Sequence, residues 1–127
     1  MLQAARFLFW SAFAFAILMA SLPQSPWLPI DRFGDKFGHA LAFAVLTLFA
    51  QLGFRTVSRW RIAERLSFFG AMIELVQSIP ALHRDCDIRD WVVDTAMVLL
   101  VTIGFVLADR RGWTQRGQAA IGEEPVA

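Results

Sequence analysis

The chain is poor in cysteine, tyrosine and charge, and each shortage narrows what it can be. A single cysteine, Cys86, excludes an internal disulfide and any metal site built from several thiolates. Charged residues make up 18% of the 127 residues, against about 25% in a typical soluble domain. The net charge is +1 and no basic stripe alternates with stacking aromatics, which argues against nucleic acid as a partner. Without tyrosine, tryptophan alone remains as an aromatic anchor at a membrane interface.

Apolar residues are abundant, at 57% of the chain, and the mean hydropathy is +0.50. They form four hydrophobic segments, at about 7–22, 37–54, 62–80 and 91–107. Each segment approaches the ~20 residues that cross a ~30 Å hydrocarbon core, and lipid favours helices because backbone groups must bond internally. We therefore expect an all-α fold: a four-helix transmembrane bundle over residues 1–108, followed by a flexible cytoplasmic tail at 109–127.

The arginines predict the orientation of this bundle. They gather before the first segment, between the second and third, and after the fourth: Arg6; Arg55, Arg59, Arg61 and Arg65; Arg110, Arg111 and Arg116. The other two connections carry mixed charge. By the positive-inside rule both termini are cytoplasmic, and the mixed connections face outward. The first segment also has features of a signal peptide, but its apolar stretch exceeds the usual length of roughly 7–15 residues, so we expect it to remain as a span.

Polar side chains that are unusual for a membrane segment lie at one edge of three segments. The second segment opens with Asp35-Lys36-x-x-His39, the third closes with Glu74-x-x-Gln77-x-x-Pro80, and the fourth follows Arg84-x-x-Asp87-x-x-Asp90-x-x-x-Asp94. If the segments alternate in direction, all three clusters meet at the outer membrane face. Ionisable groups inside a bilayer are costly and usually functional. We therefore expect a single outward-facing polar site.

The residue types in this site suggest roles. The candidate catalytic residues are Glu74, His39, Asp90 and Asp94, and the candidate substrate-binding residues are Lys36, Gln77 and Arg84. Asp87 and Asp90 are candidate ligands for a divalent cation, and carboxylate and imidazole donors suit Mg or Mn better than a thiolate-loving metal. Structural alternatives stay open. Lys36 suits a membrane boundary, Asp87 suits a helix start, and Glu74 paired with a cation would pin helices together.

The order and spacing of these motifs resemble the VanZ-like family of small bacterial membrane proteins. The resemblance covers about residues 30–108 and includes Thr95 directly after Asp94. The family's pattern more often has Asn in place of Asp94, and Gly in place of Ala96. Its name comes from a protein associated with resistance to the glycopeptide teicoplanin. The resemblance therefore implies a multi-pass protein of the bacterial inner membrane and raises the expectation of a link to glycopeptide resistance.

Two functions remain open. In the first, the polar site binds or acts on a cell-envelope or lipid-linked anionic molecule. No Ser or Cys nucleophile stands beside a base, so the sequence predicts no reaction and does not decide whether the chain is an enzyme. In the second, the chain is a non-enzymatic membrane partner or assembly protein whose polar cluster is structural. We do not expect an ion pathway, because the inner halves of the second and fourth segments offer only Thr47, Gln51 and Thr102.

Overall fold

All the regular secondary structure in the described part of the chain is helical. The computed structural model describes residues 1–23 and 29–122, apart from the side chains at positions 30, 31, 35 and 113–122. Its α-helices are α1 (Leu2–Ser21), α2 (Asp35–Gly53), α3 (Arg59–Gln77) and α4 (Ile88–Gly122), and its short 3-10 helices are η1 (Pro29–Phe33) and η2 (Pro80–Leu82). The described residues contain no strand. The prediction of an all-α fold with four main helices is confirmed.

Proline and glycine set the boundaries of these helices. Leu22 follows α1 with an extended backbone (φ −71°, ψ 133°), the conformation favoured before proline, and Pro23 comes next. Gly34 precedes α2 at φ +99°, a region that glycine enters without a steric penalty. Pro80 lies three residues after the end of α3, so the helix stops before the ring would remove a hydrogen bond.

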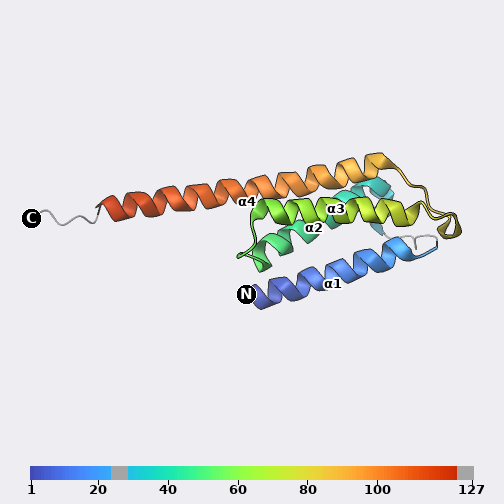
Figure 1. The fold of residues 1–127 in the computed structure, drawn as a ribbon, viewed down its shortest axis with the longest axis horizontal. Coiled ribbons are helices and arrows are strands. Elements are labelled where there is room, and N and C mark those ends of the chain that lie inside the picture. The colour runs from blue at the N-terminus through green and yellow to red at the C-terminus, as the bar shows by residue number, and fades with distance from the viewer. Residues whose placement is uncertain (24–28, 123–127) are drawn as a thin grey trace, which may run out of the picture.

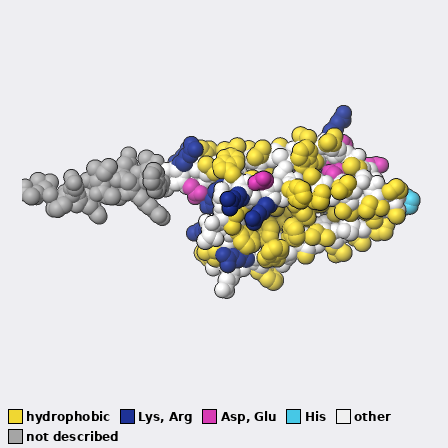
Figure 2. All heavy atoms as spheres, in the orientation of Figure 1, with side chains coloured by type: hydrophobic (Ala, Val, Ile, Leu, Met, Phe, Trp, Pro, Cys, Tyr) yellow, Lys and Arg dark blue, Asp and Glu magenta, His cyan; other side chains and the backbone are white. Residues whose placement is uncertain are grey.

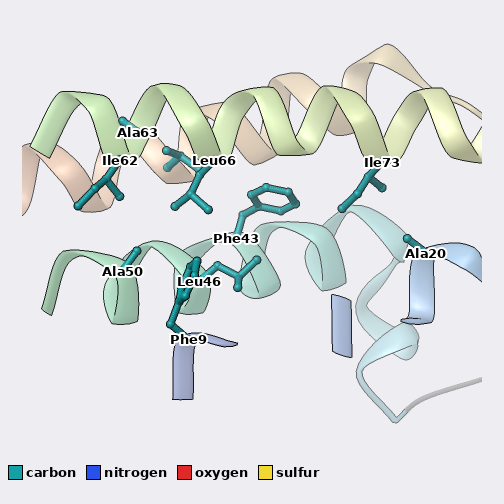
Figure 3. Close-up of a cluster of buried hydrophobic side chains, with 10 residues drawn as sticks. Phe9, Ala20, Phe43, Leu46, Ala50, Ile62, Ala63, Leu66 and Ile73 are labelled. Carbon is teal, nitrogen blue, oxygen red and sulfur yellow. The ribbon is translucent and has the colours of Figure 1, made fainter. Parts of the chain in front are cut away.

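The helices pack with α2 at the centre (Figure 1). The most extensive packing joins α2 to α4, α1 to α2, and α3 to α4, whereas α1 and α3 touch less. Phe43 and Leu46 of α2 face Leu66 of α3 in the apolar core (Figure 3). Gly70 permits the close approach of α3, since a Cβ there would lie 3.3 Å from the ring of Phe43 and 3.3 Å from that of Trp91. The apolar core is therefore formed by close contacts between neighbouring helices.

The surface of the bundle is apolar along its length and several polar side chains point inward. Large exposed hydrophobic residues include Phe7, Leu41, Phe68 and Leu100, one from each helix. Three helical stretches are long and apolar enough to cross a membrane: Leu2–Ser21, Lys36–Gly53 and Ile88–Gly112. These features support a membrane protein. The 19 residues of α3 span about 28 Å at 1.5 Å per residue, but its first turns carry four charged residues: Arg59, Arg61, Glu64 and Arg65.

The last helix is longer than the sequence predicted. We expected the fourth segment to end near residue 107 and a flexible tail to begin at 109, but α4 continues to Gly122 and extends beyond the bundle (Figure 1). Residues 108–122 contain no proline, and they are rich in alanine, arginine and glutamine, which favour a helix. The helix therefore continues through the isolated glycines of this stretch. The end of the predicted tail, residues 123–127, lies outside the described residues.

The two ends of the bundle differ in charge. Arg6 of α1 donates through Nε to the carbonyl oxygen of Gly53 at 2.8 Å, and Arg59 of α3 contacts Asp109 of α4 at 3.0 Å. Most of the Lys and Arg side chains visible in Figure 2 lie at the end from which α4 extends, and they are arginines, because the single lysine, Lys36, lies at the other end. The N-terminus lies at this same end (Figure 1). We call it the arginine end, and the opposite one, which holds the predicted site, the site end.

Candidate functional site

The three predicted motifs meet at the site end in two layers. In the outer layer, Lys36 at the start of α2 contacts two aspartates near the start of α4. Its Nζ lies 3.1 Å from Asp87 Oδ2 and 2.5 Å from Asp90 Oδ1. The side chains of Lys36 and Asp87 are 49% and 41% exposed, whereas that of Asp90 is 7% exposed. One ammonium thus contacts a surface carboxylate and a buried one, and its single positive charge balances only one of the two.

Asp87 also caps α4, as its position at a helix start suggested. Its Oδ1 accepts the backbone N–H of Arg89 at 2.9 Å, the bond that an N-cap aspartate makes to the second residue of a helix. The Arg89 amide, and then the Lys36 ammonium, hold the pKa of the Asp87 carboxyl below its ordinary value of 3.8. The two aspartates predicted as metal ligands therefore share Lys36, and Asp87 has this structural task as well.

The inner layer lies about a turn deeper and consists of His39, Glu74 and Asp94. One donor atom from each of these side chains lies within 4.8 Å of the other two. His39 Nδ1 is 3.4 Å from Asp94 Oδ2, and the backbone N–H of Asp87 donates to Glu74 Oε2 at 3.1 Å. Glu74 is 6% exposed and Asp94 is fully buried. Residues 39, 74 and 94 come from α2, α3 and α4, so only the folded bundle assembles this cluster.

Two oxygens in the inner layer have no hydrogen-bond donor among the described residues. They are Glu74 Oε1 and Asp94 Oδ1, and both are buried. Buried polar atoms almost always have a partner, so each exception calls for an explanation. The two layers also carry more negative than positive groups, because they hold four carboxylates together with the Lys36 ammonium and the His39 imidazole. Excess negative charge in such a setting requires protons or a cation.

The remaining predicted residues lie at the margin of this cluster or outside it. Gln77 is buried, at 3% exposed, and follows Glu74 by nearly one turn of α3. Arg84 donates through Nη1 to the carbonyl oxygen of Met19 at 3.1 Å. Met19 lies in the last turn of α1, where carbonyls have no partner within the helix, so Arg84 ties α1 to the connection before α4. Among the described residues, this hydrogen bond directs the guanidinium to α1 and not to either layer.

Further polar side chains, for which the sequence predicted no role, also join helices, α3 to α4 next to the site and α2 to α4 at the arginine end. Trp91 Nε1 donates to the Ser67 carbonyl oxygen at 2.9 Å, and the hydroxyls of Ser67 and Thr95 lie 2.9 Å apart. At the arginine end, Gln51 Nε2 donates to Thr102 Oγ1 at 3.1 Å. The only signal in the sequence was the presence of these polar side chains within hydrophobic segments.

The donor set defines the chemistry that this site can support. Two buried carboxylates beside an imidazole can move protons as general acid and base, or they can hold a metal ion. The nearby Cys86 is exposed and free, but desolvation and the Glu74 carboxylate raise the pKa of its thiol. Because the thiolate is the reactive form, Cys86 is a poor nucleophile at neutral pH. The arrangement therefore favours acid–base or metal chemistry over covalent catalysis by this thiol.

Comparison with known protein families, with curated proteins and with solved structures gave no match. The resemblance to the VanZ-like family consequently rests on the motifs and their spacing.

Proposed function

We propose that this chain is a VanZ-like four-span protein of a bacterial inner membrane, whose outward-facing polar site binds or acts on a cell-envelope or lipid-linked anionic molecule. The buried cluster of His39, Glu74 and Asp94 carries the proposal. A bundle that needed only stability would do as well or better with packed apolar residues at these positions. Burying two carboxylates with unpartnered oxygens is therefore a cost that a ligand would explain.

Four spans would place both termini on one side, and the arginine end would be cytoplasmic by the positive-inside rule. The shared location of the N-terminus and the arginine cluster supports this arrangement (Figures 1 and 2). In it α3 also crosses the membrane, with its charged first turns in the cytoplasmic interface, where arginine stems can reach polar lipid groups. The site would then lie in the outer leaflet, where lipid-linked envelope molecules can reach it from the bilayer.

Cys86 gives a direct test of this orientation because it is the single cysteine and is exposed at the site end. A membrane-impermeant maleimide should label Cys86 in spheroplasts, at a pH high enough to offset the raised pKa of its thiol. The control is Thr56→Cys in a Cys86→Ala background, since Thr56 is exposed between α2 and α3. It should react only after permeabilisation. The opposite labelling pattern would place the site in the cytoplasm and remove the proposed function.

Lys36 is the residue best placed to meet an anionic group. Its ammonium is half-exposed at the mouth of the site, and a phosphate or carboxylate could share it with Asp90. The buried amide of Gln77 and the carboxylates of Glu74 and Asp94 would then act on the part of the molecule that enters more deeply. In this scheme Arg84 positions the outer connection through Met19 and does not touch the ligand.

Native mass spectrometry of the protein purified from cell membranes tests binding. The wild type should carry an anionic lipid-linked molecule, and Lys36→Met and Glu74→Gln should lose it. Glu64→Gln is the matched control, because Glu64 is an exposed glutamate on the same helix. The same variants should change teicoplanin susceptibility in parallel. If the wild type, both site variants and the control carry the same lipids, the site does not bind such a molecule.

A non-enzymatic partner or assembly role is the second candidate, and the pairing of Lys36 with Asp87 and Asp90 favours it, since these contacts join α2 to α4. In that case Asp94→Asn should reduce the amount of folded protein in the membrane. A site that serves a ligand predicts instead that Asp94→Asn leaves folded protein at the wild-type level. Fluorescence-detected size-exclusion chromatography distinguishes the two results.

A further inference from the structure

We infer that His39, Glu74 and Asp94 form a binding site for one divalent transition-metal ion of the zinc or manganese type. This site lies one layer deeper than the Asp87–Asp90 pair suggested by the sequence. Its three donor atoms already lie within 4.8 Å of one another. Ligand atoms on one zinc ion are about 2.0–2.2 Å from the metal, so binding would draw these side chains together by about an ångström.

The two unpartnered oxygens point to a ligand in this cluster. Glu74 Oε1 and Asp94 Oδ1 are buried without a donor in the described part of the chain, and their residues are 6% and 0% exposed. The other oxygen of each carboxylate has a neighbour: Glu74 Oε2 accepts the Asp87 amide, and Asp94 Oδ2 lies near His39. Each carboxylate is thus oriented through one oxygen and leaves the second for a further partner. A cation would satisfy both at once.

Charge favours a metal ion as that partner. Lys36 contacts Asp87 and Asp90 in the outer layer, so its ammonium serves those two carboxylates and not the inner ones. A divalent ion would neutralise the two buried carboxylates, which the protein otherwise has to protonate or hold in mutual repulsion. The imidazole of His39 favours zinc over magnesium and calcium, which prefer sites made of oxygen ligands alone, and the two carboxylates also suit manganese.

The surrounding contacts resemble the support that metal ligands usually have. The Asp87 amide fixes Glu74, which is the kind of outer contact that orients a ligating carboxylate. Trp91, Ser67 and Thr95 join α3 to α4 within two helical turns of Glu74 and Asp94. Three protein ligands are also the number found in catalytic zinc sites, where a further position stays open. The use of that position for an anionic group rests on the proposed function, whereas the metal site itself does not.

Metal binding can be measured on the full chain in detergent after treatment with a chelator. Isothermal titration should show one saturable site for Zn²⁺, a weaker one for Mn²⁺ in line with the usual affinity order, and at least about tenfold weaker binding of Mg²⁺ and Ca²⁺. Glu74→Gln and Asp94→Asn should each lower the Zn²⁺ affinity by more than the roughly 10–100-fold that changes outside the ligand set cause. Asp87→Asn, which keeps the backbone amide, should stay within a few-fold of the wild type.

A second measurement needs no variant at these two carboxylates. With Mn²⁺ bound, electron spin echo experiments detect a directly coordinated imidazole nitrogen. The signal should survive in His83→Gln, since His83 is exposed in the connection before α4. No saturable binding at millimolar ion, no imidazole signal, or equal affinity in Glu74→Gln, Asp94→Asn and the wild type would each overturn the inference. Zinc binding without any lipid difference among the variants would support the metal site and reject the proposed function.

Discussion

Replacing Lys36 with methionine tests the outer layer most directly, because its two partners differ in burial. Asp90 Oδ1 lies 2.5 Å from Nζ on a side chain that is 7% exposed, whereas Asp87 Oδ2 lies 3.1 Å away on one that is 41% exposed. An exposed pair is worth about 0–1 kcal/mol, and breaking a buried pair costs about 3–5 kcal/mol. Lys36 itself is half-exposed, so water screens its charge, and we expect Lys36→Met to destabilise the folded bundle mainly through the loss of its contact with the buried Asp90.

A double-mutant cycle assigns that loss to one partner. The coupling free energy between Lys36→Met and Asp90→Asn should be at least about twice that between Lys36→Met and Asp87→Asn, because Asp90 is the more buried partner. Unfolding in mixed micelles with increasing SDS, followed by circular dichroism, gives the free energies. Methionine at position 36 keeps the apolar stem, so that the cycle measures charge. Equal coupling to both aspartates, or none to Asp90, would refute the reasoning from burial.

Three further outcomes follow from single contacts. Gly70→Leu should cost about 1–3 kcal/mol in the same unfolding assay because rings lie 3.3 Å from its Cβ position, whereas Gly104→Leu, with open space there, should be near neutral. The lowered pKa of Asp87 implies a contribution to stability that is present above the pKa of the unfolded chain and is lost as the pH falls through the pKa of the folded protein. The melting temperature should therefore fall less steeply below about pH 4 in Asp87→Asn than in the wild type. Gln51→Leu should lower the free energy of unfolding by about 1–3 kcal/mol by leaving its partners unpaired, without changing Zn²⁺ affinity.

The convergence of the polar motifs was predictable from the sequence. The hydrophobic segments have similar lengths and alternate in direction, so polar residues at their facing edges arrive at the same end of the bundle. Lys36 with Asp90, and His39 with Asp94, show that result in atomic contacts. The i, i+3, i+7 spacing of Asp87, Asp90 and Asp94 also placed them on one face of α4. Alternation and helical periodicity were sufficient for this much.

The pairing within the site was not predictable in the same way. Periodicity gives the face of a helix but not its depth relative to a neighbour, so the sequence suggested Asp87 and Asp90 as metal ligands when Lys36 lies between them. Arg84 was expected to bind an anion, but its observed partner is the backbone carbonyl of Met19. Every residue has such a carbonyl, so no side-chain pattern identifies the one that a helix end leaves free.

The contrast between the two ends of the bundle separates a structural polar cluster from a candidate binding site. At the arginine end, the Gln51 amide donates to Thr102 and accepts from Arg59, which in turn contacts Asp109. These groups satisfy one another and need no ligand. At the site end, Glu74 and Asp94 are also buried, yet each keeps an oxygen to which no residue in the described part of the chain donates. The same fold thus completes its polar network at one end and leaves it open at the other. An open, negatively charged network between three helices is the arrangement that a bound cation would complete.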